Sequence, residues 1–108
     1  DKKSAICAYL KEHHTGKSRA ILSRDLQRLF SIDGRNLRRK ISALRQDGCP
    51  ICSDESGYYY ADNQKEINET VCRMNELVTT ISNARTGLLF ASVLPDRGVT
   101  VEVKIKLD

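Results

Sequence analysis

The segment at residues 33–46 constrains the fold most, because only one kind of secondary structure suits its pattern. Leu37, Ile41 and Leu44 recur at spacings of four and three residues, which places them on one stripe of an α-helix. The aspartate that opens the segment is suited to cap the helix, and Gly48 is suited to end it. The pattern predicts a helix that buries a narrow stripe and exposes the rest of its surface.

The exposed side of this expected helix is basic: residues 34–46 contain five arginines and lysines and no acid. A one-sided cationic helix suits the major groove of DNA, although a solvated face on an ordinary helix has the same pattern. In the DNA interpretation, the base edges would be read by Arg35, Asn36, Arg39, Ser42 and Gln46. The phosphates would be held by Lys17, Arg19, Arg38, Lys40 and Arg45.

The excess positive charge lies in the first part of the chain. The net charge is +4, and residues 1–62 supply all of it with 12 basic and 8 acidic residues, whereas residues 63–108 have 6 of each. An anionic partner is therefore expected for the first part and another task for the second. No apolar run reaches the length of a membrane helix, so we expect a cytoplasmic protein without a membrane partner.

The elements around the basic segment have a recognisable order. A helix is expected at residues 3–14, an extended piece at 20–22 and a second helix from 23 to 30 that faces inward through Leu26, Leu29 and Phe30. A hairpin follows the basic helix, with residues 50–53 and 58–61 extended around a glycine-containing turn. Two short helices joined by a tight turn, the second one basic, form the helix-turn-helix arrangement.

These residues resemble the winged helix-turn-helix family typified by the DNA-binding domain of biotin-operon repressors. The run Ile41-Ser42-Ala43-Leu44-Arg45-Gln46-Asp47-Gly48-Cys49-Pro50-Ile51 is similar to the family's I-x-x-L-R-x-x-G-Y-P-I, and Gly57-Tyr58-Tyr59-Tyr60 to its G-Y-x-L. Phe30-Ser31-Ile32-Asp33 stands where the family has Leu-Gly-Val-Ser. The chain more loosely resembles small regulators of Gram-positive phages and mobile elements. The resemblance implies a winged helix over residues 1–62 with residues 33–47 in the major groove.

Two features depart from the family. The expected hairpin tip carries Asp54 and Glu55 without a lysine or arginine, which weakens any contact of the wing with phosphate. Nothing similar to a biotin-ligase catalytic domain follows, so ligase activity is not implied. The three consecutive tyrosines of the wing are expected to pack against the helices, and a base-stacking platform is the alternative.

A long helix is expected at residues 63–91. Its apolar residues step by four and three, which forms a heptad seam interrupted by Arg85: Ile67, Val71, Met74, Val78, Ile81 and Leu88. A helix of this length exceeds what a small domain can cover, so the seam needs another surface. A second copy is the preferred partner in a homodimer, and folding back or another protein are the alternatives.

Residues 92–108 are expected to form a turn and a half-buried C-terminal strand, because apolar and polar residues alternate from Val99 to Leu107. Such a strand must pair with the wing sheet, a partner chain or its own copy. The expected fold class is therefore α+β: a winged helix-turn-helix, a long helix and a C-terminal strand.

The four cysteines do not have the spacing of a zinc site. Cys49 and Cys52 form a C-x-x-C, but only single cysteines and the adjacent pair His13-His14 remain as further ligands. We expect no metal and no cofactor, with free thiols in a reducing cytoplasm and the two histidines at a solvated helix end.

Three classes of function follow from these patterns. The preferred one is a homodimeric regulator that binds double-stranded DNA. The alternative is a protein-interaction module that uses the winged helix as a scaffold and residues 63–91 as its binding surface. An enzyme is not expected, because the sequence has no paired-carboxylate pattern, no glycine-rich phosphate loop and no nucleophile motif.

Overall fold

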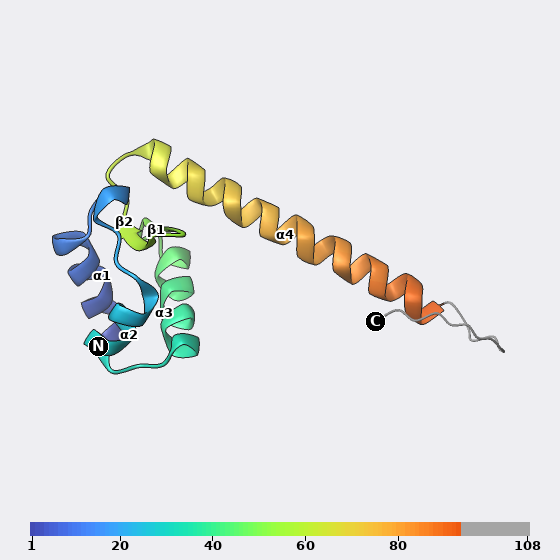
Figure 1. Cartoon of the computed structure of the whole chain (residues 1–108), viewed down its shortest axis with the longest axis horizontal. Helices are drawn as coiled ribbons and strands as arrows, with labels where there is room; N and C mark the ends of the chain where they lie inside the picture. Colours follow the sequence, from blue (N-terminus) through green and yellow to red (C-terminus); the bar gives the residue numbers. More distant parts are fainter. Residues whose placement is uncertain (94–108) are drawn as a thin grey trace. The chain divides into compact units, whose positions relative to one another are not determined.

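The computed structural model describes residues 1–93 of the chain. It is an α+β structure in which the elements follow in the order α1 (Lys2–His13), η1 (Lys17–Arg19), α2 (Ser23–Phe30), α3 (Gly34–Gln46), β1 (Ile51–Asp54), β2 (Gly57–Tyr60) and α4 (Gln64–Val93) (Figure 1). The expected strand at residues 99–107 lies outside the described residues. Residues Asp1–Cys72 form one compact unit, called the N-terminal unit below, and the chain from Arg73 onward belongs to a second.

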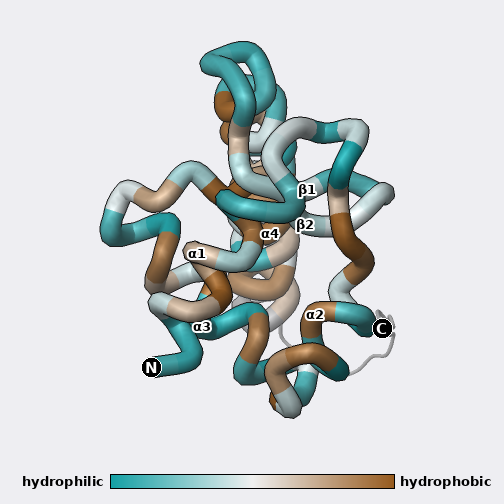
Figure 2. The backbone as a smooth tube through the Cα atoms, turned by 90° about the vertical axis from the view of Figure 1, so that its left-hand side faces the viewer, coloured by the Kyte–Doolittle hydropathy of each residue, from teal (hydrophilic) through white to brown (hydrophobic). Residues whose placement is uncertain are grey.

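The core of the N-terminal unit is formed by one stripe from each of its helices. Ile6 and Leu10 of α1, Leu26 of α2 and all three expected residues of α3 are buried together. Hydrophobic and hydrophilic stretches alternate along α3, as expected for a helix with one buried side (Figure 2). The three helices thus enclose a single apolar cluster, closed on another side by the hairpin.

The prediction that Leu29 of α2 faces the core is wrong. Leu26 is fully buried, but Leu29 is 56% exposed. On a helix, residues 29 and 30 lie on opposite sides of residue 26, and the core of this unit lies on the side of Phe30, whose ring centroid is 5.7 Å from that of Tyr9. In a helix of only two turns, the periodicity alone does not decide which of these two positions is buried.

The hairpin is extended by the segment between η1 and α2. Strands β1 and β2 pair antiparallel, with Cys52 opposite Tyr59. Ile21 exchanges both backbone hydrogen bonds with Tyr58, at 2.9 and 2.8 Å, so the outer edge of β2 is occupied. The extended piece expected at residues 20–22 is confirmed at this position and acts as a short third strand.

The two faces of the hairpin are covered by different elements. Ile51 belongs to the helical core, whereas Cys52 and Tyr59 point to the opposite face and are each 1% exposed. That face lies under the first turns of α4, where Thr70 is buried and its hydroxyl accepts a hydrogen bond from the amide of Ser53 at 3.3 Å. The N-terminal unit therefore includes the beginning of α4.

The expectation of four free thiols is wrong. Cys7 of α1 and Cys49 of the loop after α3 form a disulfide, while Cys52 is buried and free and Cys72 is exposed and free. The pair is brought together because α1 packs against the end of α3, where Lys3 also forms an ion pair with Asp47 at 2.9 Å. The two cysteines are 42 residues apart, so no local pattern indicated their proximity.

Candidate nucleic-acid interface

Helix α3 is held in place at both ends and along one side. The carboxylate of Asp33 accepts a hydrogen bond from the amide of Asn36 at 2.8 Å, which confirms the expected N-cap. The helix ends before Gly48, whose φ of 91° reverses the chain. With its apolar stripe buried, the helix presents a fixed outer face to solvent.

The outer face of α3 gathers all the residues expected to read bases. They are all exposed: Arg35, Asn36, Arg39, Ser42 and Gln46. The side-chain amide of Gln46 donates a hydrogen bond to the hydroxyl of Ser42 at 3.1 Å, which holds both at the C-terminal end of the face. The helix thus brings donor groups suited to guanine and adenine onto one surface.

Four cations of α3 have no carboxylate partner. Within residues 1–93, none of the ion pairs includes Arg35, Arg38, Arg39 or Lys40. Three of the four are exposed and Lys40 is half-buried. Unpaired positive charge concentrated on one helix favours an anionic ligand on this face.

Arg45 has a different position from these four. Its Nε donates a hydrogen bond to the carbonyl of Ile51 at 2.7 Å, and a terminal nitrogen donates to the hydroxyl of Ser53 at 3.1 Å. Burial lowers the pKa of its guanidinium below the usual range. Arg45 therefore joins α3 to β1, and its donors are directed into the protein rather than toward a phosphate.

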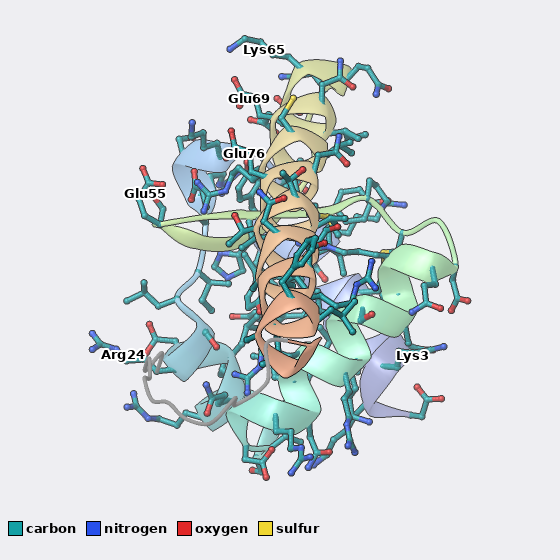
Figure 3. The ribbon with its side chains drawn as sticks, turned by 90° about the vertical axis from the view of Figure 1, so that its right-hand side faces the viewer. Lys3, Arg24, Glu55, Lys65, Glu69 and Glu76 are labelled. Atoms are coloured by element: carbon teal, nitrogen blue, oxygen red, sulfur yellow. A yellow bond between two sulfur atoms is a disulfide. The ribbon has the colours of Figure 1, made fainter. Side chains whose placement is uncertain are left out.

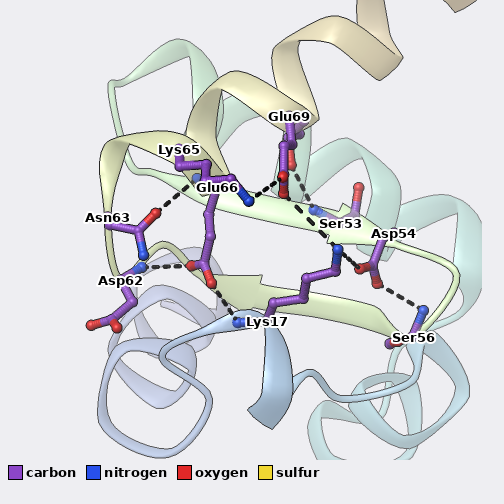
Figure 4. Close-up of polar contacts among 10 residues, drawn as sticks. Lys17, Ser53, Asp54, Ser56, Asp62, Asn63, Lys65, Glu66 and Glu69 are labelled. Atoms are coloured by element: carbon purple, nitrogen blue, oxygen red, sulfur yellow. Dashed lines mark hydrogen bonds and ion pairs between the residues drawn. The ribbon is translucent and has the colours of Figure 1, made fainter.

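Lys17 lies among carboxylates. Its ammonium is 3.8 Å from Asp54 at the end of β1 and 4.0 Å from Glu69 of α4 (Figure 4). Glu69 also accepts a hydrogen bond from Lys65 at 3.0 Å, and this bond is the main reason that its pKa lies below the usual value. Lys17 and Arg19 are the two phosphate contacts expected near η1. Of these, only Arg19 is exposed and forms no ion pair with another described residue.

The start of α4 is fixed to η1 by one carboxylate. Glu66 accepts hydrogen bonds from the backbone amides of Lys17 and Asp62, both at 2.9 Å, while Asn63 accepts from the amide of Glu66 at 3.0 Å (Figure 4). Arg19 and Asp62 border a shallow hollow beside these contacts. This hollow is lined by both signs of charge, so it has no clear preference for an anion.

Sequence reasoning did not single out Arg24. This residue is exposed in the first turn of α2, its side chain extends away from the helix (Figure 3), and no ion pair of the described chain includes it. A cation at the start of a helix is disfavoured by the helix dipole. That unfavourable placement is the signal by which the sequence could have marked Arg24 as a candidate contact for an anion.

The apolar side of α4 is exposed except at its beginning. Ile67 is half-buried beside Thr70, which packs on the hairpin. From there the large side chains are between 42 and 72% exposed: Val71, Met74, Leu77, Val78, Ile81, Leu88 and Leu89. These residues form an exposed apolar strip on α4 that starts at Val71, and Ile67 contributes mainly to the N-terminal unit.

The described residues contain no group of three or more His, Cys, Asp or Glu able to hold a metal ion. Within the same residues, no helix is both long and apolar enough to cross a membrane. No family model, curated protein or solved structure matches the chain.

Proposed function

We propose that this chain is a winged helix-turn-helix protein that binds double-stranded DNA as a homodimer, with α3 in the major groove. The observation that carries the proposal is the outer face of α3. It combines Arg35 and Arg39 with asparagine, serine and glutamine side chains suited to base edges, while Arg38 and Lys40 lie on the flanks of α3, and none of the four cations has a carboxylate partner among residues 1–93. An α-helix with such a face fits the width of the major groove.

The arrangement of the preceding elements supports this proposal. Helices α2 and α3 are separated by three residues, and Ser31 takes the left-handed conformation with φ 52°, as a tight interhelical turn requires. The β1–β2 hairpin follows α3 directly, in the position of a wing. Its tip carries Asp54 and Glu55, of which Glu55 is labelled in Figure 3, and adds no cation, so the affinity must come from α3 and its neighbours.

The exposed strip of α4 supports the homodimer. Burying half of a leucine- or valine-sized side chain contributes on the order of 1 kcal/mol, and seven such side chains lie on each copy. Burial of two strips against each other therefore contributes about 14 kcal/mol. The loss of translational and rotational freedom on association costs ~4–15 kcal/mol, so gain and cost are of similar size. We expect a dimer that forms reversibly and depends on concentration.

The test is fluorescence anisotropy of a labelled DNA duplex titrated with the protein at about 50 and 200 mM salt. The double variant Arg35→Ala/Arg39→Ala is compared with Lys11→Ala/Lys65→Ala, which removes the same charge from α1 and α4. On a selected operator, the α3 variant should bind at least about 30-fold more weakly, because each lost base contact costs roughly 1–3 kcal/mol.

Two results would contradict the proposal. If the wild-type protein binds no duplex at low salt, α3 has no role in DNA binding in this chain. If the Lys11→Ala/Lys65→Ala control weakens binding as much as the α3 variant, the affinity depends on total charge rather than on the α3 face.

A protein-interaction module is the second candidate, favoured by the same exposed strip on α4 and by the acidic hairpin tip. In that case α3 would be an ordinary solvated helix. Loss of partner binding on changing Val71 and Val78, with no effect from Arg35 and Arg39, would distinguish this function from DNA binding.

A further inference from the structure

The positions beside the seam of α4 carry no charge. In heptad terms, Val71, Val78 and Arg85 occupy a positions, and Ile67, Met74, Ile81 and Leu88 occupy d positions. The flanking e and g positions are filled by Asn68, Asn75, Ser82, Leu89, Thr70, Leu77, Ala84 and Ala91. Charge pairs at e and g normally set the orientation and the partner of two coiled helices. Here the orientation must be decided by the seam itself.

Arg85 is the residue that distinguishes the two orientations. In a parallel, in-register pair each a residue faces its own copy, so two Arg85 guanidinium groups would meet inside the seam. The seam offers no carboxylate to neutralise them, and Arg85 belongs to no ion pair in the described part of the chain. Two guanidinium groups of like charge that leave the seam at the same level repel each other.

An antiparallel pair avoids this contact, because each a residue then faces a d residue. One register pairs every a and d residue between Val71 and Leu88: Val71 faces Leu88, Val78 faces Ile81, and Arg85 faces Met74 of the other copy. Sliding by one heptad leaves Leu88 opposite Gln64, or leaves Val71 opposite a position beyond Val93, where α4 ends. In the matched register, the flexible Met74 can pack along the methylene chain of Arg85, whose charged end reaches water.

From this geometry we infer that the occupant of the α4 strip is a second copy of the chain in antiparallel orientation, with Val71 opposite Leu88. The inference rests on the homodimer of the proposed function and adds its orientation and register. A second copy fits because the a and d residues of the strip pair with one another in this register, and because the strip lacks the flanking charges that would select a different helix.

The orientation has a consequence for the DNA partner. Thr70 marks where the hairpin joins α4, and in this register Thr70 of one copy is level with residue 89 of the other. At 1.5 Å per residue, the two Thr70 residues are about 28 Å apart along the helix axis. The two DNA-binding units would therefore join the seam at opposite ends, and the operator is expected to contain two separated half-sites. A parallel pair would place both Thr70 residues at the same level.

Cross-linking of variants with one exposed free cysteine tests the orientation, since Cys52 is buried and Cys7 and Cys49 form the disulfide. Val71→Cys and Leu88→Cys are each made in a Cys72→Ser background and carry tags of different size, because Cys72 is exposed and adjacent to residue 71. Each variant alone, and the two mixed after reversible dissociation, are treated with a short bis-maleimide. We expect a mixed Val71→Cys–Leu88→Cys product and no product from either variant alone. In the antiparallel pair two residues 71 are about 26 Å apart along the axis.

The other outcomes overturn the inference in distinguishable ways. Self-products from each variant alone would show a parallel pair. No product from any mixture, with a dimer present by sedimentation, would show a different register or surface. A monomer by sedimentation would remove the homodimer from the proposed function. The anisotropy titration then decides separately whether DNA binding by α3 stands.

Discussion

At the scale of single residues, identical side chains on α3 have different uses. Arg38 is exposed and has no carboxylate partner, whereas Arg45, two turns later, donates hydrogen bonds to Ile51 and Ser53. The difference arises because β1 returns alongside the C-terminal end of α3 and offers acceptors there. One arginine is free to contact a ligand, and the other belongs to the fold.

The same substitution should therefore lower the stability of the protein at Arg45 and leave it almost unchanged at Arg38. Arg45→Met leaves the carbonyl of Ile51 without its donor and should lower the free energy of unfolding by about 2 kcal/mol. Arg38→Met should change it by less than about 0.5 kcal/mol. Thermal or urea denaturation measures both values.

DNA titrations compare the same two variants in the salt dependence of DNA binding, where the larger effect is expected at Arg38. Arg38→Met should reduce the salt dependence of binding by about one counterion, because one phosphate contact is lost. Arg45→Met should leave it unchanged at temperatures where the variant is folded. If Arg45→Met also changes the salt dependence, its guanidinium contacts phosphate after all.

At the scale of elements, the close approach of the hairpin to the strand-like segment at residue 21 depends on one glycine. Gly57 has φ 122°, and a Cβ there would lie 2.1 Å from the backbone carbonyl oxygen of Ile21. The same carbonyl accepts the hydrogen bond from Tyr58 that closes the sheet. A side chain at this position would separate the two segments.

Gly57→Ala should consequently destabilise the N-terminal unit by more than about 3 kcal/mol, since the backbone strain adds to a clash that no side-chain movement relieves. Gly48→Ala is the matched control, because its φ is also positive, at 91°, but nothing lies within 4 Å of the added carbon. Its cost should be about 1–2 kcal/mol. Equal losses in urea denaturation would mean that the contact with Ile21 is not tight.

At the scale of the whole molecule, dimerisation and folding of the N-terminal unit should be separable. The apolar strip begins after Thr70, so residues from Val71 onward are available to a partner without loss of the contacts that cover the hairpin. A charge placed in the strip should act on association alone.

Val78→Asp should shift the chain from dimer to monomer in sedimentation measurements, because a carboxylate would have to be buried between two apolar strips. The neighbouring change Thr79→Asp lies outside the seam, about 100° around α4 from Val78, and should leave the dimer intact. Both variants should keep the thermal transition of the N-terminal unit. A dimer that survives Val78→Asp would place the interface elsewhere on the chain.

The sequence by itself determined the local elements. The stripe of Leu37, Ile41 and Leu44, the cap at Asp33, the hairpin turn and the start of α4 are set by residues within a few positions of one another. Such short-range signals depend on helix and strand periodicity and on backbone conformational preferences, which a sequence displays directly. The exposed face of α3 follows from the same periodicity.

Only the tertiary structure decided how these elements use their side chains. The Cys7–Cys49 disulfide, the burial of Thr70 on the hairpin and the inward donors of Arg45 all depend on which segments become neighbours in space. Leu29 is exposed for the same reason, because the core formed on the other side of α2. Periodicity identifies a helix face, but the partner of that face is chosen by packing between residues distant in the chain.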